Sequence, residues 1–355
     1  MTNSNDFQSH SQLTIGMDLG DKISDYCVLD AEGRTLEEAR VPSSPEAFAR
    51  DLSRFRGAKL FLEVGTHARW ALETLESQGI EATAINPRQL KLIAQSRSKT
   101  DKKDARLLAQ IGQKLPGILC PVSFRSREMQ GDYRLVQSRD QLVAQRTAIV
   151  LMIKGQAKSA GVRLSGATTV FHRDLLEKIP PHLAASCVPL VKVLETLTQQ
   201  IRKIEKELER LCRERYPVTQ LLRQICGVGL ITALSFVLVI RDPKRFTNRR
   251  RLGSYLGLAP AQRSSGDQNP QLGITKHGNP YLRRILVQAA HYILGPFGKD
   301  CDLRRWGLAL CERGGKNARK RAAIAVARKL STVMLALWKS GEDYDPFYNQ
   351  REQAA

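Results

Sequence analysis

Short apolar runs and helical patterns alternate along the first third of the chain. Three apolar or weakly alternating segments come first, with a turn at residues 31–33 (Ala-Glu-Gly), which predicts an antiparallel meander. Helical and strand-like patterns then alternate up to Asn86-Pro87. The expected strands are residues 14–18, 26–29, 35–41, 59–64 and 80–85, and the expected helices are residues 45–55 and 68–78. This order predicts an α/β domain.

The middle of the chain has a helical pattern with a coiled-coil seam. Leucine and isoleucine recur there at alternating spacings of four and three, flanked by Lys, Arg and Glu. The seam consists of Leu190, Leu194, Leu197, Ile201, Ile204, Leu208 and Leu211. It predicts pairing with a second helix. That helix is either residues 135–153 of the same chain, in an antiparallel hairpin, or a helix of another subunit.

A second globular unit, mainly α-helical, is expected from residue 218 onward. Residues 225–233 read ICGVGLITA and resemble a helix-hairpin-helix turn, where Gly227 and Gly229 would expose backbone N–H groups to a phosphate. The alternative is a plain buried helix after a glycine turn. A basic cluster, a Gly/Ser/Pro-rich loop at residues 257–278 and an amphipathic helix at residues 317–338 follow.

Charge indicates the kind of partner. The chain of 355 residues carries 56 Lys and Arg against 35 Asp and Glu, a formal net charge of +21. Such a balance favours a polyanion, because Lys and Arg release counterions from phosphates. The longest uncharged run, residues 225–240, is shorter than the roughly 18 apolar residues of a spanning helix. We therefore expect a soluble cytosolic protein that binds DNA or RNA and no membrane.

Four carboxylates in the first third have the order of metal ligands. Asp18 ends the first expected strand, and Glu63 lies near the end of the fourth. Asp101 and Asp104 are three residues apart, so in a helix over residues 100–111 they share one face. Carboxylate oxygens suit Mg²⁺, and two such ions stabilise the attacking and leaving oxygens of a phosphoryl displacement. Taken singly, each acid has an ordinary alternative, at a strand end or in an ion pair with a neighbouring Lys or Arg.

A second constellation is the sequence RSSGD at residues 263–267, followed by GITKHGN at residues 273–279. A serine hydroxyl on a flexible loop among cations is suited to attack a phosphodiester. On loop statistics alone, the same residues favour a solvated turn. His277 could act as a base or simply cap the loop.

Together these motifs resemble the DEDD insertion-sequence transposases of the one-ten family, the bridge-RNA-guided serine recombinases, over nearly the whole chain. The matching features are the ordered acids Asp18, Glu63, Asp101 and Asp104, NP at residues 86–87, KTDKKDA at 99–105, ICGVG at 225–229, Phe246, LGSYLGLAP at 252–260, SG at 265–266, GITKHGN at 273–279 and RR at 283–284.

The resemblance implies a RuvC/RNase H-like fold for the first domain, with Mg²⁺ held by the four acids. It implies that Ser265 is the nucleophile and forms a covalent phosphoserine link; Ser264 beside it is the other possibility, and Gly266 favours Ser265. A bridge RNA encoded by the element would pair with double-stranded donor and target DNA. We expect a homo-oligomer, a dimer or a tetramer on DNA, in the prokaryotic cytosol and nucleoid.

The expected organisation follows from these patterns and the resemblance. The expected parts are a disordered N-terminus at residues 1–12, a RuvC-like catalytic domain at 13–125, a helical coiled-coil region at 126–216, a transposase domain at 217–345 and a tail at 346–355. The expected nucleic-acid contacts are Gly227, Gly229, Arg245, Arg249, Arg250, Arg251, Lys276, Arg283 and Arg284.

Two other functions compete with this hypothesis. A RuvC-like Holliday-junction endonuclease would hydrolyse DNA with metal-activated water and leave Ser265 unused. A non-catalytic nucleic-acid scaffold would leave the ordered acids unexplained. An actin-like ATPase is excluded because no second phosphate loop follows in the order that such proteins need.

Overall fold

The computed structural model of the chain describes residues 13–86, 101–115, 117, 119, 121–173, 175–263 and 272–349. It divides into two compact units, Met1–Phe124 and Arg125–Ala355.

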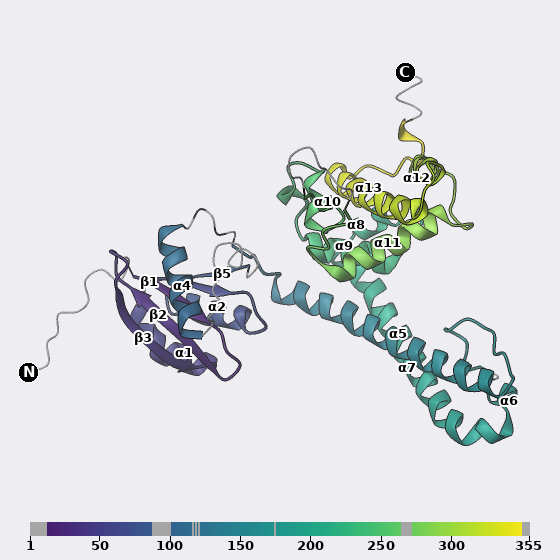
Figure 1. Ribbon diagram of the computed structural model, residues 1–355, viewed down its shortest axis with the longest axis horizontal. Coiled ribbons are helices and arrows are strands. Elements are labelled where there is room, and N and C mark those ends of the chain that lie inside the picture. The colour runs from purple at the N-terminus through teal and green to yellow at the C-terminus, as the bar shows by residue number, and fades with distance from the viewer. Residues whose placement is uncertain are drawn as a thin grey trace, which may run out of the picture. The chain divides into compact units, whose positions relative to one another are not determined.

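The first unit is built on a five-stranded mixed sheet with the strand order β3-β2-β1-β4-β5 (Figure 1). Antiparallel pairing joins β1 to β2 and β2 to β3, whereas β4 runs parallel to both β1 and β5. The strands are β1 (Thr14–Asp18), β2 (Ile23–Leu29), β3 (Thr35–Pro42), β4 (Lys59–Glu63) and β5 (Glu81–Ile85). This sheet confirms the predicted α/β fold of the first domain and is consistent with the RNase H-like order.

Helices cover both faces of the sheet. Side chains of a strand point alternately to the two faces, and one face, with Met17 and Leu62, packs on α1 (Pro45–Leu52) and α2 (Ala68–Ser77). Ser44 caps α1 by accepting a hydrogen bond from the Ala47 N–H, and Pro45 fits the first turn. The expected helix at 45–55 ends as a 3₁₀ turn, Ser53–Phe55.

The other face is covered by α4 (Asp101–Lys114). Its Ala105 and Ala109 pack on Cys27 and Leu29 of β2. Further along the helix, Leu108 and Ile111 pack on Phe61 and Ile85. The start of α4 therefore lies over the centre of the sheet.

The second unit begins with a long helical hairpin (Figure 1). Its arms are α5 (Arg127–Ser159) and α7 (Ala184–Glu214), joined through α6 (Leu175–Lys178) and a 3₁₀ turn, Pro181–Leu183. The arms are antiparallel, since Asp132 contacts Arg215 and Gln156 contacts Cys187.

The hairpin buries much of the leucine seam within the chain. Leu194, Ile201, Leu208 and Leu211 are each at most 3% exposed. The partner helix is therefore α5 of the same chain, and the seam no longer argues for a second subunit. The homo-oligomer stays a prediction.

The rest of the second unit is a helical bundle. Its helices are α8 (Val218–Leu222), α9 (Leu230–Ile240), α10 (Arg251–Tyr255), α11 (Pro280–Leu294), α12 (Asp302–Glu312) and α13 (Ala318–Ser340), with a 3₁₀ turn at Pro243–Arg245. Because α9 is apolar on all sides, it lies at the centre, with Ala233 to Ile240 buried. The base of the hairpin shares this core through Tyr133 and Leu208.

Candidate active site

Asp18 and Glu63 lie at the carboxyl ends of two adjacent parallel strands. The register pairs Met17 of β1 with Leu62 of β4, so the two acids are the next residues on each strand. Strand alternation places Asp18 on the same face as Gly16, and Glu63 on the same face as Phe61. That is the face covered by α4, so both carboxylates point to the side from which that helix approaches. Both are half-buried and have polar interactions within the chain.

The close approach of α4 depends on a glycine. A Cβ atom at Gly16 would lie 2.1 Å from the Ala105 carbonyl oxygen and 2.2 Å from the Ala109 nitrogen. The helix backbone thus rests directly on β1, two residues before Asp18. Asp104 is the neighbour of Ala105, so this contact fixes the height of the helix start above the sheet.

The structure brings three of the predicted ligands to one region of the first unit and leaves the fourth undetermined. Asp104 is half-buried in the first turn of α4. The backbone of Asp101 begins the helix, but its side chain lies outside what the structure describes. Among the described side chains, no group of three or more His, Cys, Asp or Glu is close enough to hold a metal ion. Carboxylates from two strand ends and one helix start are nonetheless the hard oxygen donors that divalent ions such as Mg²⁺ prefer.

Asp25 is a further acid that the sequence patterns did not single out. It is paired in register with Asp18 across β1 and β2, so both side chains point to the α4 face. Asp25 is only 4% exposed, and Arg40 donates a hydrogen bond to it at 3.0 Å. Like charges directly opposite each other destabilise a sheet, and Arg40 offsets this repulsion. Only the strand register, which the sequence leaves open, reveals the pairing.

The predicted nucleophile, Ser265, and its neighbour Ser264 lie outside the described residues. The two chain segments that lead to them are held together. Ala261 N–H donates to the Gly273 carbonyl at 2.8 Å, and Thr275 N–H donates to the Ala259 carbonyl at 2.9 Å. These bonds hold together the two flanks of residues 264–271, called here the serine segment.

Arg283 and two glycines stabilise the backbone of these flanks. Arg283 donates to the carbonyl oxygens of Leu256 and His277, at 3.0 and 2.9 Å. Cβ atoms at Gly257 or Gly278 would lie 2.0 Å from backbone oxygens of the facing turn, so both positions require glycine. Arg283, predicted to bind nucleic acid, thus stabilises the turn at His277 that precedes α11.

The basic cluster of Arg245, Arg249, Arg250 and Arg251 precedes these flanks in the sequence. Arg249, Arg250 and Arg251 are exposed, and in the described part of the chain they form no ion pair with a carboxylate. Arg245 differs, since it lies over the Tyr255 ring and donates to the Ile240 carbonyl. Lys276 is exposed, with a left-handed backbone at φ 57°. Exposed cations therefore lie on both sides of residues 264–271 in the sequence.

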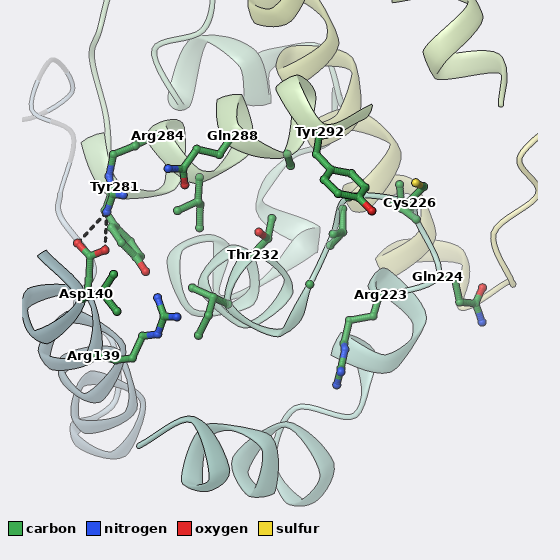
Figure 2. Close-up of a pocket in the computed structure, with 18 of the residues that line it drawn as sticks. Arg139, Asp140, Arg223, Gln224, Cys226, Thr232, Tyr281, Arg284, Gln288 and Tyr292 are labelled. Atoms are coloured by element: carbon green, nitrogen blue, oxygen red, sulfur yellow. Dashed lines mark hydrogen bonds and ion pairs between the residues drawn. The ribbon is translucent and has the colours of Figure 1, made fainter. Parts of the chain in front are cut away.

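The glycine turn before α9 opens on a pocket of about 750 Å³ (Figure 2). Gly227 has φ 85°, and a Cβ there would lie 3.1 Å from the Ala289 carbonyl oxygen, so only glycine fits this turn. Gly229 precedes the first turn of α9, which carries no side-chain cap. The structure therefore has a buried helix after a glycine turn, which both interpretations require, and phosphate binding by the backbone N–H groups stays a prediction.

Burial and charge act on Tyr281 in the same pocket. Burial raises the pKa of its hydroxyl group, and the negative charge of Asp140 raises it further. Tyr281 therefore stays neutral throughout the physiological range. The Arg284 guanidinium lies 5.0 Å from the centre of its ring.

Two family models match the chain. The model of DEDD transposases of the IS110 type matches residues 15–159, and the model described as transposase IS116/IS110/IS902 family matches residues 219–297. The chain belongs to the IS110 family of transposases. The transposase of insertion sequence IS1111A from Coxiella burnetii is 28% identical over 93% of this chain and 90% of its own length. The pilin gene-inverting protein of Moraxella lacunata is 26% identical over 78% of this chain and 77% of its own.

An IS110-family transposase is an enzyme that acts on DNA, and its DEDD domain indicates a divalent metal ion. The first model covers the sheet, α4 and all of α5, and the second covers α9, the serine segment and α11. Both candidate sites thus fall within matched segments. No helix among the described residues is long and apolar enough to cross a membrane.

Proposed function

We propose that the chain cuts and rejoins donor and target DNA of an insertion sequence through a covalent phosphoserine intermediate at Ser265. Asp18, Glu63, Asp101 and Asp104 hold Mg²⁺, and a structured bridge RNA encoded by the element guides the reaction. The observation that supports this most is the register of β1 and β4, which puts Asp18 and Glu63 side by side under the start of α4.

The metal ions would stabilise the charge that develops on the attacking and leaving oxygens. The serine Oγ attacks a phosphorus atom of the DNA backbone, and the sugar oxygen leaves as a hydroxyl group. The Oγ–P bond that forms replaces the P–O bond that breaks. A hydroxyl group of the second DNA end then attacks the same phosphorus and releases the serine. Because one ester replaces another at each step, no external energy source is needed.

Exposed cations before and after the serine segment in the sequence support the substrate assignment. They are Arg249, Arg250, Arg251 and Lys276, and exposed cations can contact phosphates. The serine and the four acids belong to different units, so the active site is composite. Binding of RNA and DNA is the proposed trigger that brings its parts together, within one subunit or between two subunits of a homo-oligomer.

A denaturation-resistant protein–DNA adduct tests this mechanism. Ser265→Ala is expected to bind RNA and DNA as the wild type does but to lose the adduct and recombination, since the alanine has no nucleophile. Ser264→Ala is the matched control and keeps both. Asp18→Asn is expected to lose strand cleavage while affinity stays within about twofold, because Lys and Arg provide the binding.

Three outcomes would contradict the proposal. An adduct in the Ser265→Ala protein would mean that another residue is the nucleophile. Undiminished cleavage by Asp18→Asn with Mg²⁺ present would refute the metal assignment. Cleavage by the wild type without any adduct would favour the alternative, a RuvC-like Holliday-junction endonuclease.

A further inference from the structure

Cations from four separate parts of the second unit line the pocket at the start of α9, called here the α9 pocket. Figure 2 labels three of them, Arg139, Arg223 and Arg284. Arg139 comes from α5, Arg223 follows α8, Arg284 belongs to α11 and Lys299 follows α11. Asp140 is the single carboxylate among the lining residues. Residues so far apart in sequence meet here only because the fold brings them together, unlike the consecutive charges of an ordinary solvated run.

Each of the three arginines is held by a carboxylate of the helical hairpin. Arg284 donates to both oxygens of Asp140 at 2.7 Å. The other two pairs are Arg139 with Glu205 at 2.5 Å and Arg223 with Glu209 at 2.7 Å. The hairpin thus supplies an anionic partner for every arginine of the pocket.

We propose that the α9 pocket binds a nucleic-acid strand by its phosphodiester groups, and that Asp140, Glu205 and Glu209 hold its arginines until phosphates replace them. This proposal rests on the DNA-transposase function of the chain and names a binding site for that function. A phosphate presents oxygens to a guanidinium in the same geometry as a carboxylate. One acceptor can therefore replace the other without moving the arginine far.

The exposure of the pairs makes this exchange easy. The side chains of Arg284 and Asp140 are 48% and 32% exposed, and those of Arg223 and Glu209 are 32% and 34% exposed. Ion pairs that water reaches contribute little free energy. Breaking them costs little when a phosphate takes the place of the carboxylate, whereas a buried pair would resist.

Other groups of the pocket complete a site for phosphates. The first turn of α9 presents backbone N–H groups, from Gly229 to Thr232, that no side chain caps. Lys299 is exposed and forms no ion pair with a described carboxylate. The volume of about 750 Å³ is far larger than one phosphate ion and suits a length of strand.

Salt dependence of binding tests the site in the full-length protein without divalent metal. The probes are a duplex DNA, its single strand and a duplex RNA, with fluorescence anisotropy as the readout. Arg284→Gln and Lys299→Gln are each expected to lower the slope of log K against log [NaCl] by about one unit, because one phosphate contact is lost. Arg210→Gln is the matched control, since Arg210 is ion-paired with Glu207 at 2.6 Å on α7 but does not line the pocket.

The carboxylates are tested in the opposite direction. Asp140→Asn removes the competitor of Arg284, so affinity at low salt is expected to rise roughly two- to fivefold. Glu207→Gln is the control, because it changes the net charge equally at a position that does not line the pocket. Its affinity is expected to rise less than that of Asp140→Asn. Thermal unfolding of each variant checks that the fold is intact.

Two results would overturn the proposal. The first is a wild-type slope in both Arg284→Gln and Lys299→Gln with every probe. The second is an Asp140→Asn affinity no higher than that of Glu207→Gln. The probe whose slope changes most identifies the strand that occupies the pocket, DNA or RNA. These binding experiments require no cleavage. If they contradict the phosphate site, the Ser265 mechanism is not affected, and if Ser265 forms no adduct, the expected salt slopes stay the same.

Discussion

Gly16 lies two residues before Asp18 on β1, and the backbone of α4 rests directly on it. A side chain at this position has no room, because its Cβ atom would overlap with backbone atoms of Ala105 and Ala109. The same face of the sheet carries Asp18 and Glu63. The distance between the acids of the sheet and those of α4 therefore depends on a missing side chain.

Gly16→Ala is expected to push the start of α4 away from the sheet. Overpacking of this kind lowers the free energy of unfolding by about 1–3 kcal/mol. Strand cleavage should fall at least as far as in Asp18→Asn, because the acids of α4 no longer reach those of the sheet. Chemical unfolding and a cleavage assay measure the two effects.

Gly65→Ala is the matched control for added bulk, since a Cβ there meets nothing within 4 Å. It is expected to change the free energy of unfolding by less than about 0.5 kcal/mol. Wild-type stability and cleavage in Gly16→Ala would contradict the close packing of α4 on β1.

Sequence and structure agree for some residues of the site more than for others. The strand-end positions of Asp18 and Glu63 could be predicted from the sequence, because each lies at or near the end of an apolar run; their role as metal ligands rests on the family resemblance and stays a prediction. Asp25 could not be selected from the sequence, because its importance comes from cross-strand register with Asp18, which depends on how β1 and β2 pair. Ser265 and the side chain of Asp101 stay predictions, since both lie outside what the structure describes.

At the scale of elements, periodicity predicted the strands and helices of the first unit closely. The main difference is β2, which begins at Ile23 rather than at residue 26. The sequence pattern does not predict the first residues of β2, because Ser24 and Asp25 are polar yet buried. Ser24 bonds to the Ser43 hydroxyl at 2.8 Å, and Asp25 bonds to Arg40. Both polar groups are buried with hydrogen-bond partners that lie far away in the sequence, and a local pattern cannot show such partners.

The leucine seam illustrates a different limit. Its spacing predicted a helix that pairs with another helix, and α7 is that helix. Spacing does not say whether the partner belongs to the same chain. The structure gives α5, with Leu194 packed near Val150 and Ile153.

Leu194→Ala is expected to destabilise the hairpin by about 2–4 kcal/mol, because it leaves a cavity among buried side chains. Val193→Ala is the control on the same helix, since Val193 is 46% exposed and should cost less than about 1 kcal/mol. Urea unfolding followed by helical circular dichroism measures both. Equal effects of the two substitutions would mean that α5 and α7 do not pack as described.

At the scale of the whole molecule, the excess of cations must be divided between local contacts and a general field. Many arginines are already paired, such as Arg50 with Asp51 and Arg305 with Asp300. Arg249, Arg250 and Arg251 are exposed and lack such partners in the described part of the chain. A cation changes the salt dependence of binding only where it contacts a phosphate, so the position of the cations matters more than their number.

If each of the three contacts a phosphate, as proposed, replacing Arg249, Arg250 and Arg251 together by alanine is expected to lower the slope of log K against log [NaCl] by about two to three units. The triple variant Arg50→Ala, Arg210→Ala and Arg305→Ala removes the same charge from paired positions and should keep the slope near that of the wild type. Binding of duplex DNA across a range of salt measures both. If the two variants lowered the slope equally, net charge alone would govern binding. If neither did, the cluster would face solvent and the phosphates would lie elsewhere.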